Sequence, residues 1–368
     1  MQDTVITNAV VVLRDRVLEN ASVYIRNQLI QEVSQRAGFA ARYAGARLVD
    51  AAGAYLLPGF IDIHSDNIET VIQPRPQSMI DFELAMREQE KQLVAQGITT
   101  MYHSLTIMDV SRGGGENAVR RNQLRSPENL KRLISLIRTF HEGDHIIRHR
   151  FRRGDMQLLS FMDHTPGQGQ YRDLEFFKQH VMLGQQTDAE KEQILAERMG
   201  RAKLTAGQLT AAADMAFEAG IPIASHDDDS PAKLDYVTQS LHARICEFPV
   251  ELSVARRARQ LGMQVVVGAT NVLMGRSHSN NLSALEAVQA GCADILVSDY
   301  FPAAILHAVF QLKERGLLTL PEAVNMATYN PARAVMVDDR LGSIEPGKCA
   351  DLLLVSKKGP IPVILAAF

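Results

Sequence analysis

Residues 56–67 read Leu56-Leu57-Pro58-Gly59-Phe60-Ile61-Asp62-Ile63-His64-Ser65-Asp66-Asn67. The apolar run over residues 56–63 predicts a β-strand buried on both faces, because its hydrophobic residues are nearly continuous rather than alternating. An imidazole and a carboxylate follow it. Side chains at positions i and i+2 of a strand share one face, so His64 and Asp66 can point the same way. The stretch therefore predicts a buried strand whose carboxyl end carries polar side chains.

Similar apolar runs recur along the chain, and amphipathic helical patterns separate most of them. The predicted strands lie at residues 56–63, 98–103, 145–151, 157–162, 221–225, 245–249, 264–268 and 294–298. Alternating strands and helices imply a parallel sheet. We therefore predict an α/β fold with a closed (β/α)8 barrel of the TIM type over residues 56–340. A doubly wound open sheet is the structural alternative.

The helices between these strands carry start and stop signals. Ser126-Pro127 offers an N-cap followed by proline at the first helical position. The motifs Thr187-x-x-Glu190 and Thr205-x-x-Gln208 predict capping boxes. A glycine suits the left-handed residue that often ends a helix. Such glycines lie between a predicted helix and the next strand at Gly97, Gly220, Gly262 and Gly291.

Both ends of the chain are strand-like. Residues 5–13, 17–25 and 29–33 are short runs rich in Val and Ile, separated by turns, and residues 351–356 form another such run. Chain termini often lie close together in a domain. We therefore predict a small β-sandwich domain built from residues 1–55 and 341–368, flanking the barrel domain at residues 56–340.

One predicted connection is too short. Only residues 150–159 separate His149 of the third strand from Ser160 of the fourth. A crossover between parallel strands needs about a dozen residues or more. Either these two strands are antiparallel, or the chain lacks a segment here. We favour the second interpretation, because a helix separates the strands in the other connections.

Polar side chains gather where the predicted strands end, which is where a barrel carries its functional groups. Besides His64 and Asp66, these residues are His103, Asp163, His164, His226, Asp227, Asp228, Asp229, Glu247 and Asp299. Imidazole together with carboxylate is a ligand set for zinc, manganese or iron rather than calcium. Their joint placement at successive strand ends predicts a site for a divalent transition metal.

Each of these residues also has a simpler interpretation. His226 and the three Asp residues after it can form a solvated acidic loop or the start of a helix, where Asp is favourable. Asp299 can cap the next helix, and Asp163-His164 can form a hydrogen-bonded turn. The metal-site prediction therefore depends on the whole set rather than on any one residue.

Two loops are suited to binding anions. Arg112-Gly113-Gly114-Gly115 follows the second strand, and a Gly-rich turn can surround a phosphate with backbone N–H groups. Residues 275–281 follow the seventh strand and precede a helix. Loops after strands seven and eight are a recurrent phosphate site in barrels. We expect Arg276, Ser277 and His278 of this loop to contact a substrate phosphate.

Composition excludes several classes of protein. Lys plus Arg is 39 and Asp plus Glu is 42, a net charge of −3, which is unlike the basic surplus of a nucleic-acid-binding protein. No apolar run approaches the roughly 18 residues that span a bilayer. The N-terminus lacks the features of a signal peptide, and the three cysteines, Cys246, Cys292 and Cys349, are too sparse for a disulfide framework. We expect a cytoplasmic enzyme with no nucleic-acid or membrane partner, and we leave a homo-oligomer open.

The motifs together resemble those of a known family. Leu57-Pro58-Gly59-Phe60-Ile61-Asp62-Ile63-His64 is similar to the first-strand signature of the amidohydrolase superfamily. Residues 342–352, from Gly342 to Leu352, resemble the segment with which that superfamily returns to its β-domain. Within it, the chain resembles the phosphonate-metabolism diphosphatases of the carbon–phosphorus lyase pathway. The motifs that carry this second resemblance are His64-Ser65-Asp66-Asn67, Met162-Asp163-His164-Thr165-Pro166-Gly167-Gln168, Ser225-His226-Asp227-Asp228, Glu247-Phe248-Pro249, Ser277-His278-Ser279 and Ser298-Asp299-Tyr300.

The resemblance implies a metal-dependent hydrolase that cleaves a ribose 5-triphosphate, bearing methylphosphonate at C1, to the 5-phosphate and diphosphate. It implies that His64, Asp66 and His226 hold the metal, most readily zinc, with manganese or iron as alternatives. His164 and Glu247 are further ligand candidates. Asp299 is a ligand candidate and the expected acceptor of the water proton, while Asp227 joins the loop residues in binding substrate.

Two alternative functions are left open. The first is another reaction of the superfamily, such as cyclic amide hydrolysis or deamination. The second is a non-catalytic scaffold within the lyase assembly, which the set of His64, Asp66, His226 and Asp299 disfavours.

Overall fold

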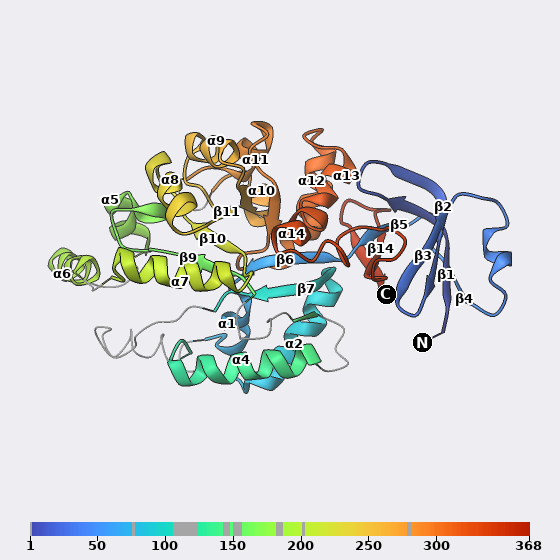
Figure 1. The fold of residues 1–368 in the computed structure, drawn as a ribbon, viewed down its shortest axis with the longest axis horizontal. Helices are drawn as coiled ribbons and strands as arrows, with labels where there is room; N and C mark the ends of the chain where they lie inside the picture. The colour runs from blue at the N-terminus through green and yellow to red at the C-terminus, as the bar shows by residue number, and fades with distance from the viewer. Residues whose placement is uncertain are drawn as a thin grey trace. The chain divides into compact units, whose positions relative to one another are not determined.

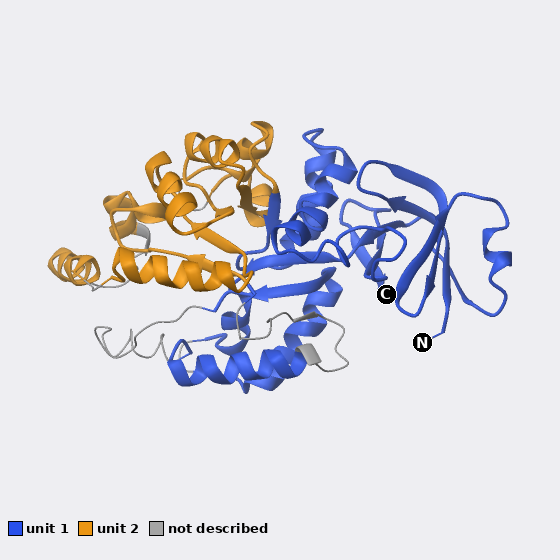
Figure 2. Ribbon diagram, in the orientation of Figure 1, with its two compact units in different colours: residues 1–157, 295–368 blue, residues 158–294 orange. Residues whose placement is uncertain are grey.

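The computed structural model describes residues 2–75, 78–105, 124–142, 148–149, 157–181, 187–200, 203–277 and 281–368, and Figure 1 shows its helices and strands. The chain divides into two compact units. Unit 1 comprises residues 1–157 and 295–368, and unit 2 comprises residues 158–294, coloured separately in Figure 2.

Unit 1 contains a mixed sheet to which both chain ends contribute. Its strand order is β15-β14-β5-β1-β2-β3, with β4 paired to β1, so the described strands belong to one continuous sheet rather than two separate ones. β14 pairs antiparallel with β5, which joins the C-terminal segment to the N-terminal one. The strands are β1 (Thr4–Val12), β2 (Val17–Arg26), β3 (Leu29–Ser34), β4 (Arg47–Asp50), β5 (Tyr55–Pro58), β14 (Leu352–Ser356) and β15 (Val363–Ala367), with the 3-10 helix η1 (Phe39–Arg42) between β3 and β4.

The two chain ends also share one hydrophobic core. Ile6, Val11 and Val23 from the N-terminal strands pack in the same cluster as Leu352 and Leu354 from β14, and all of them are nearly or fully buried. A β-domain built from both chain ends, as predicted, would need such a shared core. The exact domain boundaries at residues 55 and 341 stay a prediction.

Unit 1 also holds part of the strand–helix region. β6 (Phe60–Ser65), β7 (Ile98–His103) and β8 (Arg148–His149) form a parallel sheet in that order. β13 (Ile295–Val297) leads to a parallel bridge between Ser65 and Asp299. The helices are α1 (Asn67–Ile72), α2 (Phe82–Ala95), α4 (Pro127–Glu142), α12 (Ala304–Glu314), α13 (Leu320–Asn325) and α14 (Tyr329–Ala334).

The predicted first strand proves to be two strands. Residues 55–58 form β5 of the β-sheet domain, whereas residues 60–65 form β6. Gly59 separates them in a place without room for a side chain, because a Cβ there would lie 2.1 Å from Thr99 Oγ1 and 2.7 Å from Asp351 Oδ1. An unbroken strand over residues 56–63 is therefore wrong, although its carboxyl end lies where the sequence places it.

Unit 2 contains a parallel sheet in which β12, β11, β10 and β9 are neighbours in that order. These strands are β9 (Leu159–Phe161), β10 (Ile223–His226), β11 (Ile245–Glu247) and β12 (Gln264–Gly268). Its helices are η3 (Gly169–Tyr171), α5 (Leu174–Phe176), η4 (Phe177–Val181), α6 (Asp188–Met199), α7 (Ala206–Glu218), α8 (Pro231–Ser240), α9 (Leu252–Gln260), α10 (Ala269–Met274) and α11 (Ala284–Gln289).

The local predictions for this region are confirmed. Each of the predicted barrel strands overlaps an observed strand, β6 to β13. Both capping boxes form, at Thr187 and at Thr205. The helix-ending glycines all have positive φ: 86° at Gly97, 67° at Gly220, 73° at Gly262 and 64° at Gly291. Closure into an eight-stranded barrel stays a prediction, and the short connection after His149 lies largely outside the described residues.

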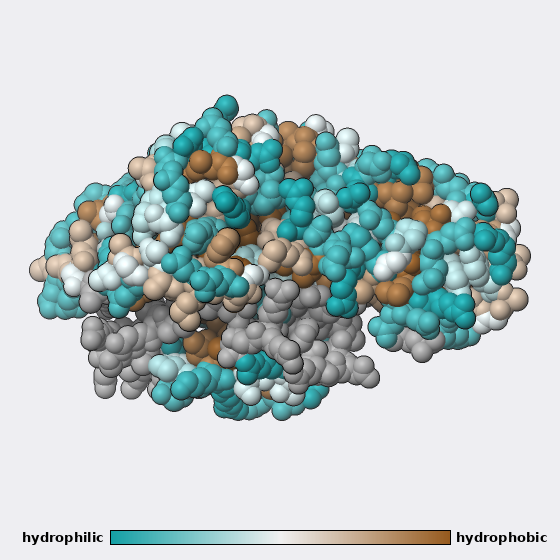
Figure 3. All heavy atoms as spheres, in the orientation of Figure 1, coloured by the Kyte–Doolittle hydropathy of each residue, from teal (hydrophilic) through white to brown (hydrophobic). Residues whose placement is uncertain are grey.

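The visible surface, the helix lengths and the state of the cysteines can be compared with what the composition predicts. In Figure 3, hydrophilic residues cover most of the visible described face, and hydrophobic residues appear in small groups. Among the described residues, no helix is both long and apolar enough to cross a bilayer. All three cysteines are free thiols; Cys246 and Cys292 are buried, and Cys349 is half-buried.

Candidate metal centre

In unit 1 the candidate residues at and just after the end of β6 lie beside Asp299. The backbone N–H of Asp299 donates to the carbonyl oxygen of His64 at 3.1 Å, and the Asp66 N–H donates to the Asp299 carbonyl at 2.8 Å. The Ser65 hydroxyl donates to the same Asp299 carbonyl at 3.1 Å and accepts a hydrogen bond from the Ser298 hydroxyl at 3.0 Å. His64 is buried, whereas Asp66 and Asp299 are half-buried. The strand ends therefore bring His64, Asp66 and Asp299 together through their backbones.

A third carboxylate, that of Asp62, contacts the backbone next to these residues. Asp62 is fully buried, and its Oδ1 accepts from the backbone N–H groups of His64 (3.3 Å) and Ser298 (3.2 Å). Burial raises the pKa of Asp62 to about 6, although the hydrogen bonds from Ser298 and His64 oppose the shift. Asp62 therefore ties the end of β6 to the segment that follows β13 and stays out of reach of solvent.

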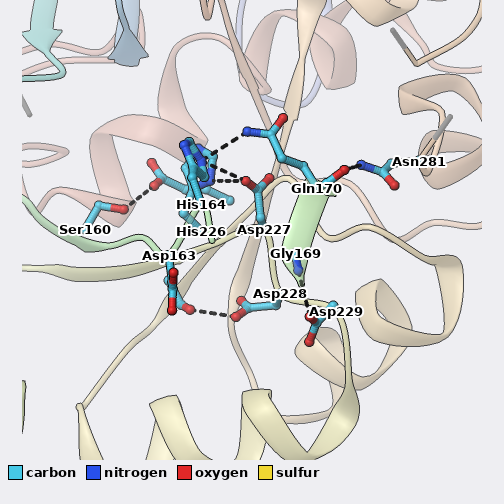
Figure 4. A network of polar contacts seen from close by, with 12 residues as sticks. Ser160, Asp163, His164, Gly169, Gln170, His226, Asp227, Asp228, Asp229 and Asn281 are labelled. Carbon is cyan, nitrogen blue, oxygen red and sulfur yellow. Dashed lines mark hydrogen bonds and ion pairs between the residues drawn. The ribbon is translucent and has the colours of Figure 1, made fainter. Parts of the chain in front are cut away.

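In unit 2 two imidazoles converge on one carboxylate. His164 Nε2 lies 3.1 Å from Asp227 Oδ2, and His226 Nδ1 lies 3.0 Å from the same oxygen. Figure 4 shows the two rings and Asp227 in close contact. The side chains of His226 and Asp227 are only 8% and 5% exposed, whereas that of His164 is 39% exposed. The group thus opens toward solvent on the His164 side.

The electrostatics of this group favour an ionised Asp227. Burial alone would raise the pKa of the Asp227 carboxyl, but the charge of His226 and hydrogen bonding by His164 and His226 hold it well below its usual value. A carboxylate can fix which ring nitrogen of a neighbouring histidine carries the proton. Asp227 therefore orients both rings and keeps a negative charge next to them.

The donor set of unit 2 fits a transition-metal ion. His164, His226 and Asp227 each offer a ligand atom, and these atoms all lie within 4.8 Å of one another. Two imidazoles with one carboxylate form a combination that zinc, manganese and iron accept.

Further polar groups surround this cluster. The Ser160 hydroxyl donates to Glu247 Oε2 at 2.6 Å, which fixes the fully buried Glu247 carboxylate at the end of β11. Gln170 Nε2 lies 3.1 Å from His164 Nε2, and Asn281 Nδ2 donates to the Gln170 carbonyl at 3.5 Å. The backbone of Gly169 packs against Asp227, because a Cβ there would lie 3.2 Å from Asp227 Cβ.

The remaining predicted site residues are Arg276, Ser277 and His278. Arg276 is exposed and takes no part in the network drawn in Figure 4, while Ser277 is half-buried. His278 lies outside the described residues, as does the loop Arg112–Gly115. Asp227 was expected to bind substrate; that role stays a prediction, and its observed contacts are with two histidines.

Sequence reasoning missed several residues that build the site, above all Lys233. Its ammonium lies 3.1 Å from the His226 carbonyl, 3.2 Å from the Asp227 carbonyl and 3.4 Å from Asp228 Oδ1. One signal in the sequence points to it. A lysine in the first turn of a helix opposes the helix dipole, so its presence calls for a compensating partner.

Comparison with known proteins identifies the family. The model of the amidohydrolase family matches residues 186–368. The chain is 35% identical, over 334 residues, to the α-D-ribose 1-methylphosphonate 5-triphosphate diphosphatase of Escherichia coli K12, an alignment that covers 84% of this chain and 85% of that protein. This match confirms the resemblance noted in the sequence.

Two solved structures superpose on nearly all of this chain and so share its fold. An amidohydrolase from Thermotoga maritima superposes with a TM-score of 0.63 at 16% identity, covering 99% of this chain and 97% of that one. Enamidase, a member of the amidohydrolase superfamily, superposes with a TM-score of 0.62 at 15% identity, covering 100% and 94%. Together with the family match and the 35% identity to the Escherichia coli diphosphatase, this shows that the chain is a hydrolase that belongs to the amidohydrolase family.

Proposed function

We propose that the protein is a metal-dependent diphosphatase of phosphonate catabolism. Its substrate is α-D-ribose 1-methylphosphonate 5-triphosphate, and its products are the 5-phosphate and diphosphate. The observation that carries the proposal is the 35% identity to the Escherichia coli enzyme of that name over most of both chains. The strand-end histidines and carboxylates support it, because they supply the ligand types that a hydrolytic metal centre needs.

The metal ligands that we propose are His64, Asp66 and His226. Asp299, His164 and Glu247 are further candidates. Zinc is the first candidate, with manganese and iron as alternatives. When bound, such an ion would lower the pKa of a coordinated water to about 7 and so supply hydroxide at neutral pH.

The chain's own groups complete the chemistry. We propose that the Asp299 carboxylate accepts the proton of the attacking water. The water oxygen forms a bond to phosphorus, the anhydride bond between the α- and β-phosphates breaks, and diphosphate leaves with the bonding electron pair. Arg276, Ser277 and His278 are proposed to bind the oxygens of the triphosphate or of the phosphonate, with Asp227 as a further substrate-binding candidate.

A comparison of substrates tests this function. Purified protein loaded with zinc, manganese or iron is incubated in parallel with the ribose triphosphate and with cyclic amides of the dihydroorotate type. We expect hydrolysis of the triphosphate alone, and its loss when a chelator removes the metal. Hydrolysis of the cyclic amides with no turnover of the triphosphate would instead support a different reaction of the family. No turnover of any substrate by fully metal-loaded protein would favour a scaffold.

A further inference from the structure

The Lys233 ammonium sits among three acceptors from three consecutive residues. Its Nζ lies 3.1 Å from the His226 carbonyl oxygen, 3.2 Å from the Asp227 carbonyl oxygen and 3.4 Å from Asp228 Oδ1. A lysine ammonium has three N–H donors and no acceptor. The number of donors therefore matches the number of acceptors, and the side chain is only 27% exposed.

The backbone places Lys233 for this contact. Ser230 is the N-cap of α8, and its hydroxyl accepts the Lys233 backbone N–H at 3.3 Å, so Lys233 is fixed in the first helical turn. A positive charge at this end of a helix is unfavourable by itself. The carbonyl oxygens and the carboxylate offset that cost, so the Lys233 side chain is directed back toward the end of β10.

The turn that Lys233 contacts is unusual. Asp227 has a φ of +52°, a left-handed conformation that is uncommon outside glycine and is held only where the surroundings determine it. The Asp227 N–H is fixed by the Glu247 carbonyl at 2.8 Å. Lys233 binds the two carbonyls of the same turn, so its ammonium and Glu247 together hold the turn in this shape.

We propose that Lys233 is a positioning residue of the metal centre. By binding the carbonyls of His226 and Asp227, it fixes the direction in which the His226 imidazole and the Asp227 carboxylate leave the backbone. The inference deepens the proposed function and rests on it, because its effect is read as metal affinity and as turnover.

A simpler role for Lys233 would be to neutralise Asp228. That carboxylate is fully buried and also accepts hydrogen bonds from the Ser225 hydroxyl at 2.6 Å and the Cys246 thiol at 3.3 Å. If Lys233 only neutralised the charge of Asp228, any cationic side chain of similar length could replace it. A guanidinium keeps the charge but presents its donors in a planar fork, which does not converge on three acceptors around one nitrogen.

The test compares Lys233→Arg with a control, Lys191→Arg on α6 of the same unit. Three quantities are measured for each purified full-length protein: zinc affinity by competition with a chelator, kcat/KM for the ribose triphosphate, and Tm. We expect Lys233→Arg to lose about 10- to 100-fold in zinc affinity, as changes to groups that orient metal ligands commonly do, and to lose kcat/KM as well. Lys191→Arg should match wild type in all three quantities.

A chemical rescue sharpens the test. Lys233→Cys, treated with 2-bromoethylamine, regains an ammonium at nearly the original position, and wild type treated in parallel controls for reaction at Cys349. We expect the untreated variant to lose zinc affinity and the treated one to recover it to within about threefold of wild type. If Lys233→Arg fails to fold, the zinc affinities of untreated and treated Lys233→Cys decide whether the ammonium positions the metal ligands. The two samples come from one preparation of the same variant, so they differ only in the treatment.

Two results would overturn the inference. One is wild-type zinc affinity together with wild-type Tm in Lys233→Arg, which would mean that Lys233 only neutralises the charge of Asp228. The other is a fall in Tm with unchanged zinc affinity, which would make the role purely structural. Failure of the proposed function is distinct from both, because wild type itself would then bind no zinc or leave the triphosphate intact.

Discussion

The backbone N–H of Asp66 donates a 2.8 Å hydrogen bond to the backbone carbonyl of Asp299. Asp299 in turn donates its own N–H to the carbonyl of His64 at 3.1 Å. These contacts involve no side-chain atoms, so the backbone of Asp299 stays attached to the end of β6 whatever its side chain is. A change of the Asp299 side chain therefore leaves the donors and acceptors of these two hydrogen bonds in place.

Asp299→Asn is the appropriate substitution for testing the role of that side chain. Asp299 has a φ of +60°, and asparagine is among the residues that best tolerate this conformation. Because a general base contributes roughly 10²- to 10⁴-fold, we expect kcat to fall by that factor while KM and Tm stay near wild type. Steady-state kinetics and a thermal melt measure these quantities. A parallel loss of bound metal would instead make Asp299 chiefly a ligand.

His226→Asn should lower metal content. His226 is buried at the end of β10 and lies against Asp227, so its loss removes an imidazole from the donor set. His242→Asn is the matched control, because His242 belongs to the same unit and pairs with Asp214 outside the network drawn in Figure 4. Elemental analysis of both variants after expression in zinc-supplemented medium should show less metal for His226→Asn only. Full occupancy of His226→Asn would remove His226 from the ligand set.

Arg276→Ala should weaken catalysis without affecting the metal. A charge-assisted hydrogen bond to a phosphate contributes about 1.5–3 kcal/mol, so kcat/KM should fall roughly 10- to 100-fold at unchanged metal content. Arg256→Ala, at an exposed position of α9, is the control for loss of a surface charge. If Arg276→Ala and Arg256→Ala both stay within a factor of two of wild type, the loop after β12 does not bind substrate, and the loop Arg112–Gly115 becomes the next candidate.

Gly59→Ala should destabilise the protein. The added Cβ would lie 2.1 Å from Thr99 Oγ1, whose hydroxyl donates to Asp351 Oδ2 at 2.9 Å, so the change displaces a buried hydrogen bond. Overpacking of this kind typically costs about 1–3 kcal/mol. Gly207→Ala in α7 is the control, because nothing lies within 4 Å of its Cβ position, and it should be neutral or stabilise by at most about 1 kcal/mol. Denaturant unfolding of both variants gives the comparison, and equal stabilities would contradict the steric account.

The predictions that succeeded depend on local sequence. Strand positions, capping boxes and helix-ending glycines follow from hydrophobic pattern and backbone chemistry within a few residues. The division at Gly59 was not visible, because it arises from Thr99 and Asp351, which are distant in the sequence. Lys233 was missed for a different reason: its partners are near in the sequence, but the contact depends on how α8 folds back on the end of β10.

The measurement that tests the account most directly is the product ratio formed by zinc-loaded wild type from α-D-ribose 1-methylphosphonate 5-triphosphate. We predict the 5-phosphate and diphosphate in equal amounts with no orthophosphate, no turnover after chelation, and recovery of turnover when zinc is restored. Release of orthophosphate, or an intact triphosphate in the presence of fully zinc-loaded protein, would contradict the proposal that this chain is the diphosphatase.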